Sequence, residues 1–326
     1  MQLTIEKINL DLASPFSITG YTFTTTDTVL VTLTDDGQSG RGEAAGIYYL
    51  DETQDSMAAD LERVRAEVEA GATREEVQRL LPAGGARNAL DCAYWDLDAK
   101  KQGRSVAETL GLSPLKDLTT VYTIGIADAV GMARAAEEAS AYPHLKIKLD
   151  AEDVIGRMKA IRAARPDASL IIDVNQGWTF DQLKEYTPAL ADMGVAMIEQ
   201  PLARGGDEAL EGYKSPVPLG ADESCLHSGE YEAVARFYDV INIKLDKTGG
   251  LTDALKLADM TINDGKDLMV GNMMGSSLSM APSFLIGQRC KFVDIDGPLL
   301  LKEDIQHGLD YRDAGQVSPP TPALWG

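Results

Sequence analysis

Polar and apolar residues alternate along the first 45 positions of the chain. The segments LTIEKINLDL and TVLVTLTDD follow this two-residue period, and a turn at Asp36 and Gly37 separates the second of them from a short GRGEAAG segment. Such alternation is typical of half-buried β-strands. The pattern therefore predicts an antiparallel sheet at the start of the chain.

The hydrophobic period changes to that of a helix between Asp55 and about Gly103. In the stretch ARNALDCAYWDLDAKKQG, the side chains of Ala86, Leu90 and Leu97 fall on one face. Apolar residues at this spacing predict amphipathic helices. The first third of the chain is therefore expected to be an α+β domain.

Beyond LGLSPLKDL, short apolar segments alternate with amphipathic helical ones. Eight segments fit strands: VYTIGI, LKIKLD, SLIIDVN, AMIEQPL, PLGADES, VINIKLD, LMVGNMM and KFVDID. This alternation is typical of parallel βα units, and eight such units predict a closed (β/α)₈ barrel. An open doubly wound sheet is the alternative, but the chain has no GxGxxG or Walker A sequence to favour it.

Lysines lie near the ends of two predicted strands. Alternate side chains of a barrel strand point into the lumen, and catalytic groups lie at the C-terminal strand ends. Lys146 and Lys148 share one parity on the second strand, and Lys244 has lumen parity on the sixth, whereas Lys247 falls out of that register. Because these strands are opposite each other in an eight-stranded barrel, Lys148 and Lys244 should face each other. A lone lysine there would instead be a solvated rim residue.

Three carboxylates have the same lumen parity on the strands in between. They are Asp173, Glu199 and Asp222, on the third, fourth and fifth strands. Three anions in one barrel mouth repel one another unless a cation is present, and Mg²⁺ prefers oxygen ligands. The set therefore predicts a magnesium site, although Asp222 alone could equally be a helix N-cap.

Charge and composition exclude several other classes of protein. The chain has 51 acidic and 30 basic residues, a formal net charge of -21, which argues against binding nucleic acid or anionic membranes. The chain has no run of 18 apolar residues, and charges interrupt its first apolar segment, so neither a membrane span nor a signal peptide is predicted. Three cysteines are too few for a disulfide framework, and a cytoplasmic protein is expected. Because the chain has only three histidines, we expect lysines and carboxylates to carry any reaction.

These motifs together resemble the muconate-lactonizing-enzyme subgroup of the enolase superfamily. The segments that carry the resemblance are Lys146-Ile147-Lys148, Asp173-Val174-Asn175, Ile198-Glu199-Gln200-Pro201-Leu202, Ala221-Asp222-Glu223-Ser224, the run from Ile243 to Gly250, and Ala86-Arg87-Asn88-Ala89-Leu90-Asp91 with Trp95-Asp96-Leu97. The resemblance implies an α+β capping domain over residues 1–115, a barrel over 116–300, and a segment over 301–326 that returns to the capping domain.

The last predicted strand is similar to that of the dipeptide epimerases in this subgroup. Asp294-Ile295-Asp296 resembles the motif that holds the free ammonium group of a dipeptide substrate. The resemblance implies a Mg²⁺-dependent epimerase that inverts the Cα of the C-terminal residue through a metal-stabilised enolate. Lys148 and Lys244 would be the two bases, and Lys146 would help to lower the pKa of Lys148. The sequence leaves open whether the protein forms a homo-oligomer.

One stretch departs from the best-known branch, the L-Ala-D/L-Glu epimerases. The mobile loop that usually offers them an arginine corresponds to Ile18–Thr26, which contains Tyr21, Phe23 and a threonine run but no basic residue. We therefore expect a dipeptide with a neutral or apolar second residue. The alternatives are an L-Ala-D/L-Glu epimerase proper, a cycloisomerase or o-succinylbenzoate synthase of the same subgroup, and a barrel that binds without catalysis.

Overall fold

The computed structural model describes residues 1–326, and its N-terminal part is built on a long antiparallel sheet. The sheet has the order β1 (Gln2–Ile18), β2 (Tyr21–Asp35) and β3 (Gln38–Ala45). Alternate residues of β2 are buried, as the two-residue period predicts. The sheet is therefore half-buried, with one face available to pack against helices.

Helices cover the buried face of this sheet. They are α1 (Gln54–Arg63), α2 (Arg65–Glu69), α3 (Arg74–Leu80) and α4 (Gly85–Gln102), followed by α5 (Val106–Thr109) and preceded by the 3₁₀ turn η1 (Tyr48–Leu50). Helix α4 lies directly on β3, where Gly42 allows the close approach. A Cβ at that position would lie 2.1 Å from the carbonyl oxygen of Ala89. The glycine is therefore needed for the contact between strand and helix.

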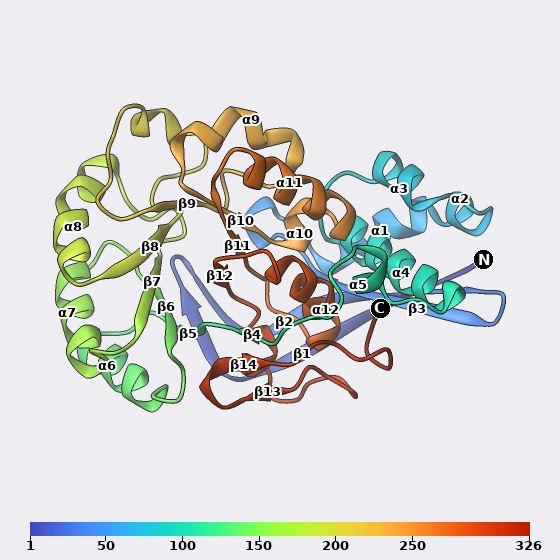
Figure 1. Cartoon of the computed structure of the whole chain (residues 1–326), viewed down its shortest axis with the longest axis horizontal. Helices are drawn as coiled ribbons and strands as arrows, with labels where there is room; N and C mark the ends of the chain where they lie inside the picture. The colour runs from blue at the N-terminus through green and yellow to red at the C-terminus, as the bar shows by residue number, and fades with distance from the viewer.

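The rest of the chain forms a barrel of eight parallel strands in sequential order (Figure 1). The strands are β5 (Tyr122–Ile124), β6 (His144–Lys148), β7 (Ser169–Asp173), β8 (Val195–Glu199), β9 (Leu219–Ala221), β10 (Val240–Ile243), β11 (Asp267–Val270) and β12 (Phe292–Val293). A hydrogen bond from Val121 N to Val293 O, 2.9 Å, links the first strand to the last. The predicted (β/α)₈ barrel with an N-terminal α+β domain is confirmed.

Helical segments connect these strands on the outside of the barrel. They are α6 (Ala129–Glu138), α7 (Val154–Ala164), α8 (Phe180–Asp192), η2 (Asp207–Leu210), η3 (Ser228–Glu230), α9 (Tyr231–Val234), η4 (Ala235–Phe237), α10 (Leu245–Thr248), α11 (Leu251–Asn263), α12 (Ser277–Gly287) and α13 (Gly297–Leu300). The connections after β8 and β9 contain only short helices. The helix layer is therefore thinner there than beside α6, α7 and α8 (Figure 1).

Strand parity separates the barrel core into two layers. Residues of one parity pack with the surrounding helices in a large apolar cluster. Residues of the other parity form a small apolar floor inside the lumen, made of Val121, Ile171, Met197, Val240, Met269 and Phe292. Two residues further along several of these strands the lumen becomes charged. The floor therefore seals one end of the lumen beneath a polar layer.

The C-terminal residues return to the N-terminal domain. The strands β13 (Tyr311–Arg312) and β14 (Gln316–Val317) flank η5 (Asp313–Gly315) and pair with each other, and β14 also pairs with β4 (Leu118–Thr119). The chain then runs back to helix α4. There Trp325 Nε1 donates to Cys92 O at 3.0 Å, and Gly326 N donates to Asp96 Oδ1 at 2.8 Å. The last residues therefore connect the barrel to the first domain.

The stretch Ile18–Thr26, which we expected to be a loop, is instead the tip of the β1–β2 hairpin. Ile18 pairs with Tyr21 and Phe16 pairs with Phe23, so that only two residues make the turn. The expectation was wrong because threonine and aromatic residues favour strand geometry and prolong the pairing. Thr19 Oγ1 lies 3.1 Å from both Leu149 O and Val174 O, just beyond β6 and β7. The tip therefore lies over the C-terminal ends of barrel strands.

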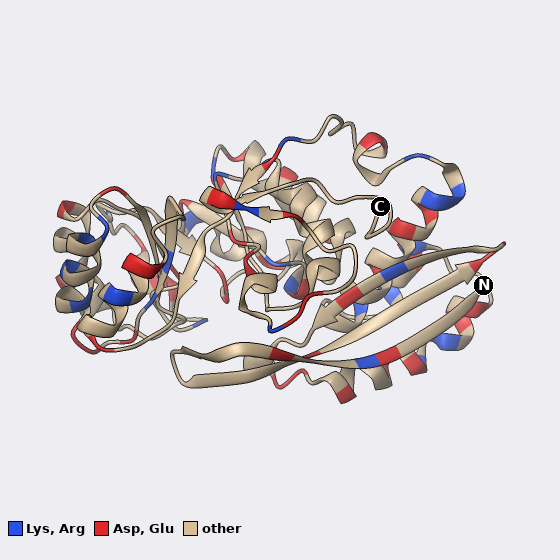
Figure 2. Cartoon of the chain, turned by 90° about the horizontal axis from the view of Figure 1, so that it is seen from below, with Lys and Arg blue, Asp and Glu red and all other residues tan.

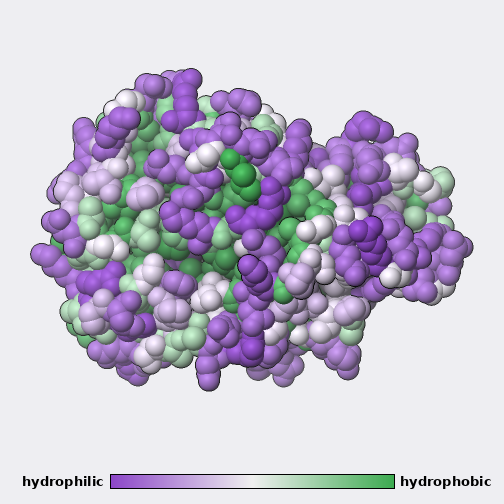
Figure 3. Space-filling model, viewed as in Figure 1, coloured by the Kyte–Doolittle hydropathy of each residue, from purple (hydrophilic) through white to green (hydrophobic).

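The surface is predominantly polar. Acidic and basic residues are interspersed on helices at both ends of the molecule (Figure 2), and hydrophilic residues cover most of the face in Figure 3, with hydrophobic residues visible towards its centre. None of the helices combines the length and the hydropathy that crossing a bilayer requires.

Candidate active site

Lys146 is an almost fully enclosed cation of the polar layer. Its side chain is 2% exposed, and its Nζ atom lies 3.0 Å from Asp173 Oδ2, 2.8 Å from Glu199 Oε2 and 2.8 Å from Asp294 Oδ2. The three acceptors come from three separate strand ends. Lys146 therefore ties together carboxylates that would otherwise repel one another.

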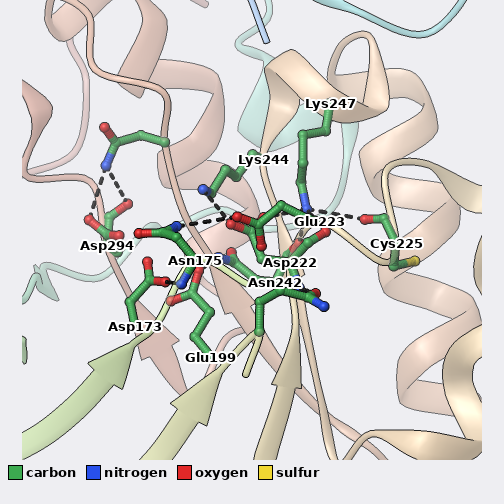
Figure 4. A network of polar contacts seen from close by, with 12 residues as sticks. Asp173, Asn175, Glu199, Asp222, Glu223, Cys225, Asn242, Lys244, Lys247 and Asp294 are labelled. Atoms are coloured by element: carbon green, nitrogen blue, oxygen red, sulfur yellow. Dashed lines mark hydrogen bonds and ion pairs between the residues drawn. The ribbon is translucent and has the colours of Figure 1, made fainter. Parts of the chain in front are cut away.

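Lys148 and Lys244 enter the same layer from opposite sides. Lys148 Nζ donates to Asp173 Oδ2 at 2.6 Å and to Asn175 Oδ1 at 3.0 Å. Lys244, directly after β10, donates to Asp222 Oδ2 at 2.7 Å (Figure 4). Both lysines are almost fully buried. The strand parity of the sequence thus brings these side chains to the same end of the lumen.

The carboxylates differ in their electrostatic surroundings. Burial acts to raise the pKa of Asp173, but Lys148 and Lys146 lower it to about 2. In the same way Lys244 and Lys247 outweigh burial and hold the pKa of Asp222 well below its usual range. Glu199 differs because burial and Asp173 raise its pKa to about 7. The layer therefore holds two firmly ionised aspartates and one glutamate that titrates near neutrality.

The carboxylates around Lys146 and Lys244 act against the lowered pKa that a lysine base needs. Burial acts to lower the pKa of Lys146 and of Lys244, but the surrounding carboxylates raise both above the ordinary value. The expected lowering of a lysine pKa includes the charge of a bound cation, which would offset the charge of the carboxylates. In the protein alone that charge acts on the lysines.

The acidic set fits a hard divalent cation in chemistry and burial. Asp173, Glu199 and Asp222 are 0% exposed and lie at three adjacent strand ends. Lysine ammonium groups lie between these carboxylates, so their oxygens do not form a ready-made metal-binding cluster in the protein alone. Glu199 Oε2 lies 2.8 Å from Lys146 Nζ and Asp222 Oδ1 lies 2.6 Å from Lys247 Nζ, so an ammonium group matches each oxygen where a cation would bind. Buried carboxylate oxygens at adjacent strand ends are ligands that a hard divalent cation prefers.

Asp294 and Asp296 follow β12 and are both buried. Asp294 pairs with Lys146 and also accepts from Asn272 Nδ2 at 3.0 Å, whereas Asp296 Oδ2 accepts from Thr123 N at 2.8 Å. Burial and the neighbouring Asp294 raise the pKa of Asp296 to about 8. Asp296 therefore tends to keep its proton near neutral pH, and the charge of Asp294 is already matched by Lys146.

Sequence reasoning missed two charged residues of the site. Lys247 is 0% exposed, lies 2.6 Å from Asp222 Oδ1 and donates to three backbone carbonyls. It was set aside because it breaks strand parity, and it does so because it lies on helix α10. Glu223 is also buried, with its carboxylate against Asn175. Burial and Asp222 raise its pKa to about 8.

An aromatic group lies beside the polar layer. The rings of Tyr21 and Phe23 pack edge-on against Tyr48, with centroids 4.7 and 5.5 Å away, and Tyr48 packs against Tyr49. Tyr21 is 45% exposed, whereas the hydroxyl oxygen of Tyr49 is buried without a hydrogen-bond partner. These rings form a wall beside the polar layer, and Tyr48 and Tyr49 reach it from the 3₁₀ turn η1.

Comparison with protein families places this geometry in context. Residues 1–111 match the N-terminal domain of the mandelate racemase / muconate lactonizing enzyme family, and residues 130–320 match the enolase C-terminal domain-like family. The chain belongs to the enolase superfamily. Its two-part architecture, a capping sheet over a barrel, is thereby accounted for.

Two relatives within the superfamily are similar over most of their length. The N-acetyl-D-glutamate racemase of a Pseudoalteromonas species is 46% identical over 251 residues, which are 77% of this chain and 79% of the relative. The L-Ala-D/L-Glu epimerase of Escherichia coli is 41% identical over 303 residues, covering 92% and 94%. Their names confirm the predicted enzyme class, an isomerase, and the predicted subgroup resemblance.

Solved structures of the superfamily agree with the fold throughout. An enolase family member from Agrobacterium tumefaciens with homology to dipeptide epimerases, with bound sodium and L-Ala-L-Glu, is 42% identical and superimposes with a TM-score of 0.97 over 99% of both chains. The dipeptide epimerase of Cytophaga hutchinsonii, complexed with Mg and D-Ala-L-Val, is 25% identical with a TM-score of 0.91 over 98% of this chain and 93% of that one.

Proposed function

We propose that this protein is a dipeptide epimerase that moves the α-proton of the C-terminal residue between two lysines. The observation that carries the proposal is the pair Lys148 and Lys244, buried on opposite sides of one lumen around three carboxylates. Two bases on opposite faces of one carbon are what inversion of a stereocentre requires. The similarity to epimerases and racemases supports the same class of reaction.

In this proposal Asp173, Glu199 and Asp222 hold Mg²⁺. When bound, the cation supplies positive charge to the substrate carboxylate as the α-carbon loses its proton. The magnesium in the related dipeptide epimerase of Cytophaga hutchinsonii supports this assignment. The same charge would offset the carboxylates that now raise the pKa of Lys244, which would favour its neutral form as a base.

The remaining residues of the site would orient the two bases and the substrate. Lys148 or Lys244, whichever is neutral, removes the proton, and the other, as an ammonium group, returns one to the opposite face. Lys146 holds Asp173, Glu199 and Asp294 in place. Asp294 and Asp296 would accept hydrogen bonds from the N-terminal ammonium of the dipeptide.

The second side chain of the substrate is proposed to be neutral or apolar. The hairpin tip presents Tyr21 and Phe23 and no basic residue. Arg204, after β8, is a candidate carboxylate partner, but it is already paired with Glu230 at 2.6 Å. Burying a glutamate carboxylate beside these rings without a partner costs free energy.

A second candidate is racemisation of an N-acyl amino acid. The observation that favours it is the ion pair between Asp294 and Lys146, together with the raised pKa of Asp296, which leaves little free negative charge for an ammonium group. The 46% identity to an N-acetyl-D-glutamate racemase points the same way. The two candidates share the lysines and differ only in what the amino end of the substrate carries.

A substrate screen in deuterated water tests the proposal. Dipeptides and N-acyl amino acids are incubated with the protein and Mg²⁺, and mass spectrometry scores a gain of one deuterium without any other change in mass. We expect label in dipeptides with free ammonium groups. Label confined to N-acyl amino acids would select the second candidate, and product that has lost or rearranged atoms would select a cycloisomerase or dehydratase.

A further inference from the structure

Lys148 and Lys244 are held in different ways. Lys148 Nζ donates to two side-chain acceptors, Asp173 Oδ2 at 2.6 Å and Asn175 Oδ1 at 3.0 Å, whereas Lys244 Nζ donates to Asp222 alone. A lysine nitrogen has four tetrahedral positions, one of which Cε occupies. Two donated bonds therefore leave Lys148 a single position, a third N–H or a lone pair, for a substrate. The direction of that position depends on Asn175.

Asn175 is in turn fixed from two sides. Its φ of 45° lies in the left-handed region, which asparagine adopts more readily than most residues, and its backbone N donates to Asp173 Oδ1 at 3.0 Å. Its side-chain Nδ2 donates to Glu223 Oε1 at 3.3 Å (Figure 4). An amide has one oxygen and one nitrogen, so a nitrogen that faces Glu223 turns the oxygen towards Lys148.

Glu223 has no other partner in the protein that would explain its burial. Its residue is 1% exposed, its Oε2 atom accepts no hydrogen bond, and no lysine or arginine pairs with it. An unpaired buried carboxyl group destabilises the folded state. An apolar residue of similar size would serve folding better, so the observations favour a role in the site.

We propose that Glu223 is a positioning residue for Lys148: through Asn175 it fixes the direction in which the lysine nitrogen faces the α-carbon. The chain of contacts runs from Glu223 Oε1 through Asn175 Nδ2 and Oδ1 to Lys148 Nζ, and Lys244 has no counterpart to it. The proposal rests on the proposed function, because it concerns one of the two bases. If Glu223 positions only Lys148, proton transfer on one face of the α-carbon should depend on Glu223 and transfer on the other face should not.

The test compares α-proton exchange from the two epimers of one dipeptide in deuterated water at saturating Mg²⁺. Lys148→Ala first identifies the epimer whose exchange depends on Lys148. Glu223→Leu, which has no acceptor, should slow exchange from that epimer by about 10- to 100-fold and leave the other within about twofold, as expected for a misoriented base. The matched control is Glu223→Gln, which keeps an acceptor oxygen and should preserve the ratio between the epimers.

Each outcome bears on the proposal. The proposal is overturned if Glu223→Leu slows exchange from both epimers equally or from neither. It is also overturned if Glu223→Gln changes the ratio of the two exchange rates as much as Glu223→Leu does. If Glu223→Leu fails to fold by circular dichroism, Asn175→Ala replaces it and should show the same imbalance, because it also leaves Lys148 with Asp173 alone. If the wild-type protein exchanges no α-proton of any dipeptide, the proposed function fails before the variants are compared.

Discussion

Lys148 and Lys244 approach one lumen from opposite strands, and each is held against a different carboxylate. In the proposed reaction one removes the proton and the other returns it, so neither can replace the other. Lys148→Ala and Lys244→Ala should each lower kcat for epimerisation by a factor of at least about 10³, in the range of lost acid-base catalysis.

Exchange without inversion separates the two lysine variants. Each should still exchange the α-proton of one epimer with solvent, and the two should retain opposite epimers. Proton NMR in deuterated water measures both rates. A variant with full two-way turnover would show that the substituted lysine is no base in this enzyme.

Removal of metal tests the carboxylate set. Asp173, Glu199 and Asp222 are buried and crowded with lysines, and we expect the protein to be inactive after treatment with a chelator and to recover with Mg²⁺. Calorimetric titration of the metal-free protein should show Mg²⁺ binding that Asp222→Asn weakens. Full activity in metal-free protein would refute the assignment.

At this scale the sequence identified residues that follow strand parity and missed those that do not. Lys146, Lys148 and Lys244 could be found because a two-residue period carries them into the lumen. Lys247 could not, since it reaches Asp222 from helix α10, and Tyr48 could not, since it lies on a 3₁₀ turn of the other domain. Such contacts depend on tertiary packing, which a local period does not describe.

Among the secondary structure elements, the β1–β2 hairpin bears most directly on specificity. Its tip places Tyr21 and Phe23 against Tyr48, while Thr22 and Thr24 have the opposite strand parity. The tip thus borders the site with rings and carries no guanidinium group. A substrate carboxylate would have to be desolvated there without a partner.

We therefore expect Ala-Phe, Ala-Leu and Ala-Gln to have higher kcat/KM than Ala-Glu. Tyr21→Arg should raise kcat/KM for Ala-Glu relative to Ala-Phe by about tenfold, which corresponds to about 1.4 kcal/mol. Thr24→Arg, on the other face of the strand, is the matched control and should leave the ratio unchanged. If wild-type Ala-Glu is the best substrate by about tenfold, which is again about 1.4 kcal/mol, the argument from the tip is wrong.

The elements were predicted well where hydrophobic periods are long. The three N-terminal strands and the eight barrel strands follow their two-residue or fully apolar patterns. The hairpin tip was expected to be a loop because the resemblance implies a mobile loop there, whereas its threonine and aromatic residues prolong the strand pairing. The domain limits at residues 115 and 300 stay predictions, and the last two residues of the chain bind to helix α4 of the first domain.

The whole molecule depends on a polar interface between helix α4 and the barrel. Asp91, on α4, accepts from Thr252 N at 3.0 Å and from Thr252 Oγ1 at 2.6 Å on helix α11. Gly250 makes the approach possible: its φ is 113°, and a Cβ there would lie 2.4 Å from Asp91 Oδ2. This interface holds the capping sheet, and with it the hairpin tip, over the lumen.

Asp91 gives the interface a pH dependence of known sign. Burial raises its pKa from 3.8 to about 6, despite the donors from Thr252. The folded state therefore binds the proton more tightly than the unfolded state, so this contribution to stability is complete below about pH 4 and is lost as the pH rises through 6. The free energy of unfolding should fall by about 3 kcal/mol over that range from Asp91 alone.

Urea unfolding between pH 4 and pH 7 measures this effect. Asp91→Asn should flatten the pH dependence of the free energy of unfolding relative to the wild-type protein. Asp36→Asn, at a position 83% exposed, is the matched control and should leave the pH dependence unchanged. Identical slopes for the wild type and Asp91→Asn would show that Asp91 does not titrate in this range.

The central claim is proton transfer at one carbon by two lysines on opposite faces. It is tested most directly by incubating a single dipeptide epimer, such as L-Ala-L-Phe, with the Mg²⁺-loaded protein in deuterated water and analysing the epimer formed by proton NMR. We expect this epimer, L-Ala-D-Phe, to carry deuterium at the α-carbon of phenylalanine and nowhere else. An inverted product that retains its original α-proton, formed while the wild-type protein turns over, would contradict it.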